Sequence, residues 1–313
     1  MDFDVEYVKT LLPTRPEDSH KGVFGSVLNI SGCRNYSGAA YFSSVAALKV
    51  GAGKSTLASV SPVLASVAAF SPDVILMPLD ETREKTISSR SIKKIEKVLK
   101  NFDVITVGCG ISSNKDTAKF FEKLIKVLAG MDIPVVIDAD GLTLLSKLKD
   151  VKLPKNTILT PHPKEFARLM GVNVENVLLQ PEFWVKKCCE KYNCTTVLKM
   201  HKTMVADNKG NFYVNNSGNS ALSHGGSGDV LCGMIAGFLA SGVHSRQEPA
   251  YEERVENENL HRSHSDLSCF GASILAVYLH GLTAEIASQD LTEYSTLSSD
   301  LLKYIQEAIK TIL

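Results

Sequence analysis

Short β-branched and apolar runs alternate with longer amphipathic runs over about the first two hundred positions of this 313-residue chain. Runs of the first kind predict buried strands, and runs of the second kind predict helices that cover them. The expected strands are 26–30, 55–60, 74–77, 104–107, 135–138, 157–160 and 195–199. The expected helices are 38–50, 91–100, 115–129, 163–170 and 181–192. The alternation is typical of β-α-β units, so the sequence predicts an α/β fold with a mostly parallel central sheet.

The pattern changes after Lys199. Segments 203–207 and 212–215 flank a turn of Asn, Lys and Gly, which predicts a hairpin at the edge of the sheet. A long helical region then closes the chain. One stretch, 244–266, is rich in charge and poor in apolar residues, and we expect it to be a polar surface insertion in a single catalytic domain spanning 1–313.

Composition narrows the functional classes. The 34 basic residues equal the 34 acidic ones, so no global positive field attracts nucleic acid or an anionic membrane. The longest apolar stretches, such as 63–70 and 228–240, are broken short of the ~20 residues that a membrane span needs. The acidic start lacks a signal-peptide pattern, and the seven cysteines are scattered without a C-x-x-C pair. These features predict reduced thiols, a cytoplasmic protein and no zinc site.

Residues 50–56 read Val-Gly-Ala-Gly-Lys-Ser-Thr and match part of the signature of a phosphate-binding P-loop. The signature fails because Leu48 stands where its first glycine is needed. The order of elements also fails, since a P-loop runs from strand to helix and here a predicted helix precedes a predicted strand. We interpret the segment as a helix-to-strand turn.

The strongest local signal is Gly225-Gly-Ser-Gly-Asp229, followed by apolar residues at helical spacing. Free N–H groups and the positive end of the helix dipole at such a start favour a phosphate or a phosphoryl group in transfer. Asp229 has two readings. It is either a cap or dipole partner, or the general base that takes a hydroxyl proton during phosphoryl transfer.

Three more polar segments come directly after predicted strands: 107–110, 137–141 and 160–166. Open α/β sheets bind their ligands at the carboxyl ends of the strands, so these segments should converge in one crevice. Taken singly, His162 could be a structural histidine, and Asp138 or Asp140 a helix cap. Their joint placement favours a functional site.

Seven motifs stand in a fixed order along the chain: KGVFGSVLNISG (21–32), SGAA (37–40), GAG (51–53), DADGL (138–142), LTPHPKEF (159–166), GGSGDVL (225–231) and VYLHG (277–281). Over about residues 10–290 the chain resembles the NAD(P)H-hydrate dehydratase family of the ribokinase-like superfamily. The resemblance implies a three-layer α/β/α sandwich. It also implies an enzyme that phosphorylates the ring hydroxyl of hydrated NADH or NADPH and then eliminates phosphate, using ADP or ATP as phosphoryl donor and Mg²⁺.

The same resemblance assigns roles to residues. Asp229 would be the base, and the amides of Gly226, Ser227 and Gly228 would hold the moving phosphoryl group. The substrate-binding positions would be Ala39, Gly110, His162 and Asp229. The nucleotide-binding positions would be Lys199, Met200, His201, Lys202, Thr203 and Gly228. The carboxylates that organise Mg²⁺, through water, would be Asp138 and Glu165.

Two departures and two alternatives accompany the resemblance. Met200 replaces a family glycine, where a side chain could reshape the nucleotide contact, and the polar segment 244–266 is additional. The family suggests a homotetramer, and a fused epimerase domain would need roughly ~200 further residues, so we expect any epimerase to be a separate protein. The alternatives are a kinase of a small alcohol or vitamin precursor, and a nucleotide-binding protein without catalysis.

Overall fold

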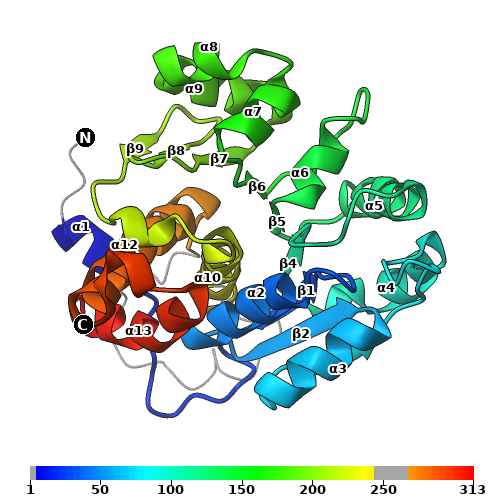
Figure 1. Ribbon diagram of the computed structural model, residues 1–313, viewed down its shortest axis with the longest axis horizontal. Helices are drawn as coiled ribbons and strands as arrows, with labels where there is room; N and C mark the ends of the chain where they lie inside the picture. Colours follow the sequence, from blue (N-terminus) through cyan, green and yellow to red (C-terminus); the bar gives the residue numbers. More distant parts are fainter. Residues whose placement is uncertain (1–4, 243–266) are drawn as a thin grey trace, which may run out of the picture.

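The computed structural model describes residues 5–242 and 267–313, and its centre is a nine-stranded sheet in the order β3-β2-β1-β4-β5-β6-β7-β8-β9 (Figure 1). Neighbouring strands from β3 to β7 are parallel, and β8 and β9 are added antiparallel at one edge. The strand bounds are β1 Ser26–Ile30, β2 Lys54–Ser59, β3 Ile75–Pro78, β4 Val104–Val107, β5 Val135–Ile137, β6 Thr157–Leu159, β7 Thr195–Leu198, β8 Met204–Ala206 and β9 Phe212–Val214.

Helices cover both faces of the sheet, which makes a three-layer sandwich (Figure 1). The chain runs from β1 towards β3 and later from β4 towards β7, so right-handed crossovers place the two sets of helices on opposite faces. On the first face lie α2 Ser37–Lys49, α3 Ser61–Phe70, α10 Ser227–Gly242 and α12 Cys269–Ser295, with α13 Ser298–Lys310 outside them. On the second lie α4 Ile92–Val98, α5 Lys115–Leu128, α6 Asp140–Leu145, α7 Pro163–Met170, α8 Val174–Leu179 and α9 Pro181–Tyr192.

Two glycines fix the position of α10 against α2. A Cβ atom on Gly233 would lie 2.3 Å from the carbonyl oxygen of Ser43, and one on Gly237 would lie 2.4 Å from that of Ala47. Only glycine permits such close approach of two helices, because any side chain would overlap the facing backbone. The contact holds the start of α10 beside the carboxyl ends of β4 and β5.

Most sequence predictions about the fold are confirmed. Strands β1 and β4 and helices α7 and α9 have the predicted bounds, and β8 and β9 form the predicted hairpin. Residues 50–53 join α2 to β2, which confirms the helix-to-strand turn. The sequence analysis did not predict the separate helices α1 (Val5–Thr10), α3, α6 and α8. The polar segment 244–266 lies outside the described residues.

Helix α12 is long and strongly apolar. It is the one described helix long and apolar enough to cross a membrane, with a mean hydropathy of 1.4 over 18 residues, and 72% of that window is buried inside the protein. Its polar residues Ser273, His280 and Thr283 are buried too, and the two hydroxyls donate to carbonyls one turn earlier. Packing in the core accounts for its hydropathy.

Candidate active site

The loops that follow β4 and β5 are pressed together at the carboxyl edge of the sheet. Gly108 has a φ of +128°, and a Cβ atom there would lie 2.0 Å from the carbonyl oxygen of Asp138. Gly110 has a φ of +65°, and its Cβ would lie 3.0 Å from the Cβ of Ala39. The structure therefore brings together two of the predicted substrate positions, Ala39 and Gly110, beside the Asp138 loop.

An ion pair lies at the centre of this edge. Asp138 is 1% exposed, and its Oδ1 accepts hydrogen bonds from Lys199 Nζ (2.7 Å) and from the N–H of Ala139 (2.8 Å). Burial alone would lower the pKa of Lys199, but the carboxylates of Asp138 and Glu165 outweigh burial and raise it. Lys199 is thus a permanent cation. A Cβ on Gly228 would lie 3.2 Å from its Nζ, so this cation faces the start of α10.

Most of the first amides of α10 have no hydrogen-bond acceptor among the described residues, and we call such a helix start open. Gly226 adopts a φ of +99°, and a Cβ there would lie 2.6 Å from the Phe42 ring. The amides of Gly226, Gly228 and Asp229 meet no acceptor in the described part of the chain. That of Ser227 differs from expectation, since it donates to the carbonyl of His224 at 3.3 Å. Unpaired amides, the helix dipole and Lys199 together form a site for an anion.

Asp229 stands in the first turn of this helix. Burial, and next the negative charge of Asp138, raise its pKa to about 6, while a hydrogen bond from the Cys109 thiol and the charge of Lys199 act the other way. The carboxyl is still mostly ionised at neutral pH and is far more basic than an exposed aspartate. Such a group can accept a proton from a hydroxyl held next to it.

His162 caps helix α7. Its Nδ1 accepts hydrogen bonds from the N–H groups of Lys164 (3.1 Å) and Glu165 (3.5 Å), and Glu165 Oε2 accepts from the N–H of His162 (2.9 Å). The structural role weighed in the sequence analysis is therefore present. The ring is half exposed, and burial lowers its pKa, while the nearby charges of Lys199 and Asp138 act on it in opposite directions.

The comparison with known proteins identifies the family. The family profile described as NAD(P)H-hydrate dehydratase matches residues 27–307. The chain belongs to this family. An ADP-dependent (S)-NAD(P)H-hydrate dehydratase from Neisseria meningitidis is 35% identical over 284 residues, with 87% of each chain covered.

Two further comparisons define the extent of the likeness. A bifunctional NAD(P)H-hydrate repair enzyme from Thermofilum pendens is 30% identical over 305 residues, which are 96% of this chain and 53% of that protein. The chain thus spans about half the length of such bifunctional relatives. The crystal structure of a Bacillus subtilis ADP/ATP-dependent NAD(P)H-hydrate dehydratase, co-crystallized with ATP/Mg²⁺, has a TM-score of 0.80 at 26% identity, covering 99% of this chain and 98% of that one. The predicted ribokinase-like fold is confirmed.

The departure from the family pattern at Met200 causes no backbone strain. Met200 is not among the described residues with positive φ, and its side chain packs partly buried against the core. Its N–H donates to Thr203 Oγ1 at 3.4 Å, and that hydroxyl donates to the Met200 carbonyl at 3.2 Å. The segment is a closed turn with exposed His201 and Lys202, which begins beside Gly228 at Lys199.

The two carboxylates predicted to organise Mg²⁺ already have partners. Asp138 Oδ1 is bonded to Lys199, and Glu165 Oε2 to the N–H of His162. Burial raises the pKa of Glu165 to about 7, and the charge of Asp138 adds to this. Such a donor set fits an ion that keeps most of its water and is held by nucleotide phosphates, with Asp138 and Glu165 as outer neighbours.

Two site residues were missed as functional candidates. His280 is buried in α12, its Nε2 lies 3.4 Å from Ser227 Oγ, and burial lowers its pKa to about 4, so a neutral ring supports the first turn of α10. Cys109 lies near Asp229, and its thiol lowers the pKa of that carboxyl. His280 lies in the motif VYLHG and Cys109 in segment 107–110, but neither spacing predicted a role for these two residues.

Proposed function

We propose that this protein is an ADP-dependent NAD(P)H-hydrate dehydratase that restores hydrated NADH and NADPH to the reduced coenzymes. One observation carries the proposal: the open start of α10 places Asp229 beside unpaired amides and the permanent cation Lys199. The membership of the chain in the family supports the same activity.

In the first step, the ring hydroxyl of the substrate attacks the terminal phosphorus of the nucleotide. The oxygen–phosphorus bond forms as the phosphorus–oxygen bond to the nucleotide breaks, and Asp229 takes the hydroxyl proton. The amides of Gly226 and Gly228 bind the transferring oxygens, and Lys199 offsets their negative charge. The Ser227 amide contributes if its weak bond to His224 is exchanged for the phosphoryl oxygen.

In the second step, the carbon–oxygen bond breaks and phosphate leaves with the electron pair. The adjacent ring carbon then loses a proton to water, and the electron pair of that carbon–hydrogen bond forms the double bond that regenerates the dihydropyridine ring. We assign Ala39 and Gly110, which lie close together beside the Asp138 loop, and His162, which follows the neighbouring strand β6, to the hydrated nicotinamide. Residues 199–203 and Gly228 are assigned to the nucleotide. Bound Mg²⁺ would supply charge neutralisation on the phosphates, next to Asp138 and Glu165.

ADP is our choice of donor, because the Neisseria relative is named as ADP-dependent. The Bacillus subtilis protein, named for both nucleotides, makes ATP the second candidate. Two further assignments stay proposals: a homotetramer and a cytoplasmic location.

The test is to incubate the purified protein with hydrated NADH, Mg²⁺ and either ADP or ATP. The absorbance of reduced nicotinamide should return together with one inorganic phosphate per turnover, and faster with ADP. A stable phosphorylated alcohol without phosphate release would instead indicate a small-alcohol kinase. Nucleotide binding without turnover of any substrate would indicate a protein that retains the fold alone.

A further inference from the structure

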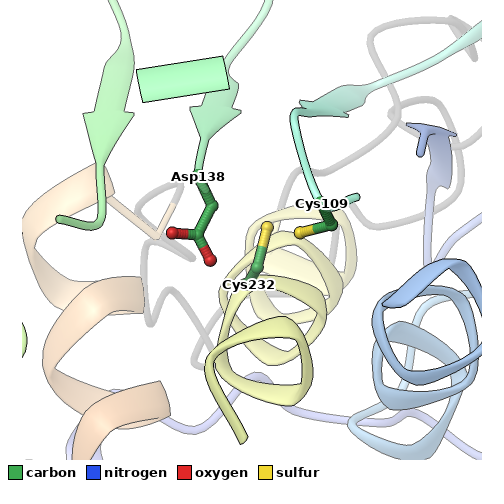
Figure 2. Close-up of side chains that lie close together, drawn as sticks. All are labelled: Cys109, Asp138 and Cys232. Atoms are coloured by element: carbon green, nitrogen blue, oxygen red, sulfur yellow. The ribbon is translucent and has the colours of Figure 1, made fainter. Parts of the chain in front are cut away.

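Three side chains with metal-ligating atoms lie close together between the carboxyl ends of β4 and β5 and helix α10 (Figure 2). Cys109 follows β4, Asp138 follows β5, and Cys232 lies on α10. One ligand atom from each lies within 4.8 Å of the other two, and the residues are 1%, 1% and 0% exposed. Figure 2 shows the two sulfurs and the carboxylate turned towards one another.

The fold, and not a local motif, creates this group. Strands β4 and β5 are parallel neighbours, so the residues that follow them are adjacent, and Gly108 lets the two loops touch. Cys232 comes three residues after Asp229 on α10, and residues at that spacing share one face of a helix. The close packing of α10 against α2 then brings its sulfur to the two loops.

The donor set selects a class of ion. Two thiolates and one carboxylate suit borderline and soft cations such as Zn²⁺ and Cd²⁺, whereas Mg²⁺ takes oxygen ligands. Three atoms no more than 4.8 Å apart all lie within about 2.8 Å of a common point. Zinc needs about 2.3 Å to sulfur and about 2.0–2.2 Å to oxygen, so a contraction of about half an ångström completes three of its four positions.

Charge balance favours the same ion. Two thiolates and the Asp138 carboxylate carry three negative charges, and a divalent cation with Lys199 carries three positive ones. The charges of the ion, its three ligands and Lys199 therefore cancel, so that binding adds no uncompensated charge of its own to the buried region. Lys199 already holds Asp138 Oδ1, which leaves the second carboxylate oxygen as the metal ligand.

We propose that Cys109, Asp138 and Cys232 form a binding site for a divalent cation of the Zn²⁺ class, and that occupation of this site inhibits the enzyme. The bound ion brings a positive charge next to the base and to Lys199. The binding part of the proposal is independent of the proposed function, and the inhibition part rests on it.

The first test uses Co²⁺ as a spectroscopic probe. Titration of the reduced wild-type protein should give thiolate-to-cobalt charge-transfer absorbance at one ion per chain, and Zn²⁺ should abolish it. Cys109→Ser and Cys232→Ser should each weaken binding at least about tenfold. The matched control is Cys269→Ser, which removes a cysteine remote from the cluster and should bind Co²⁺ as the wild type does.

No charge-transfer band in the wild type, or a band of equal strength in Cys109→Ser and Cys232→Ser, would overturn the site. Circular dichroism establishes that each variant is folded, and Cys232→Ala replaces Cys232→Ser where the serine variant does not fold. This readout needs no catalytic activity, so its failure is distinguishable from failure of the proposed function.

The second test measures turnover with Mg²⁺ in excess and rising Zn²⁺. Wild-type and Cys269→Ser activity should fall and return on addition of a chelator. Each variant is compared with its own zinc-free rate, and Cys232→Ser should need at least about tenfold more Zn²⁺ for the same fractional loss. Equal sensitivity of Cys232→Ser and wild type would contradict inhibition through this site.

Discussion

Helices α7 and α10 both begin at the carboxyl edge of the sheet, and their starts are built in opposite ways. At α7 the first amides are satisfied by His162 Nδ1, and Glu165 closes the capping box. At α10 the amides of Gly226, Gly228 and Asp229 have no acceptor among the described residues. A closed start stabilises its own helix, whereas an open start retains donors for a ligand.

Both starts hold a largely buried carboxyl with a raised pKa, and the two carboxyls differ in the use made of their oxygens. The raised pKa of Asp229 means that the protein bears a cost to hold an ionised carboxylate in a buried place. Glu165 has a raised pKa as well, yet its oxygen accepts the His162 N–H and so serves the cap. Chemistry is thus assigned to α10 and support to α7, and all variants below except the control Asp116→Asn alter one of the two starts.

Asp229→Asn should have the largest effect. It keeps the shape of the open start and removes only the proton acceptor, so kcat should fall by about 10²–10⁴-fold. Isothermal titration should give an ADP affinity within roughly threefold of wild type, because the amides and Lys199 remain. A kcat close to that of wild type would contradict the assignment of the base.

Gly226→Ala should distort part of the anion site through a steric clash. The new Cβ would lie 2.6 Å from the Phe42 ring at a φ of +99°, so the turn must move and displace its amides, and kcat should fall at least about tenfold. The matched control is Gly225→Ala, whose Cβ would meet nothing within 4 Å; its kcat should stay within roughly twofold of wild type. Equal losses of kcat in both variants would contradict a specific role of Gly226 in positioning the amides.

A pair of variants separates the two functions of His162. Asparagine is a good helix cap and alanine is not, so His162→Ala should lower the unfolding free energy by about 1 kcal/mol and His162→Asn by much less. Both lose the imidazole, and KM for hydrated NADH should rise roughly 3–10-fold in both. An unchanged KM in His162→Asn would contradict a role in substrate binding and leave His162 with the role of a helix cap alone.

The smallest effect concerns stability and pH. The folded pKa of Asp229, about 6, exceeds the ordinary aspartate value of 3.8, so stability declines as pH rises through that window and the full cost is present above it. Asp229→Asn should therefore raise the melting temperature at about pH 7.5 by a few degrees at most. This gain should vanish near about pH 4, where the wild-type carboxyl is protonated.

Asp116→Asn is the opposite control for that measurement. Hydrogen bonds from Ser89 lower the pKa of Asp116, so its contribution to stability is present above the unfolded pKa and is lost as pH falls through the folded one. This variant should melt below wild type at neutral pH with unchanged kcat. A melting temperature of Asp229→Asn below that of wild type would contradict the strained state of Asp229.

The periodicity of the chain predicted the sheet and the helices that cross it, because apolar spacing reports burial directly. It did not predict α3 or α6. Helix α3 is apolar on most of its surface, and α6 is only six residues long and follows Ala139, which has a φ of +51°. Neither has a clear polar face from which a helix could be recognised.

The site was predicted in part. The strand-end positions of Asp138 and His162 could be placed at one edge of the sheet from topology alone, and the motif around Asp229 was expected beside them. The Asp138–Lys199 ion pair, the support of Ser227 by His280, and the meeting of Cys109 with Cys232 could not. These contacts join residues 53 to 123 positions apart and depend on side-chain directions that spacing does not encode.

The dependence of kcat/KM on pH, measured with hydrated NADH and ADP, tests the central claim that a buried aspartate at the open start of α10 is the base. The rate should fall about tenfold per pH unit below pH of about 6, in the wild type and equally in Glu165→Gln, whose own carboxyl is gone. A rate that stays constant through this range, while the protein remains folded, would contradict the account.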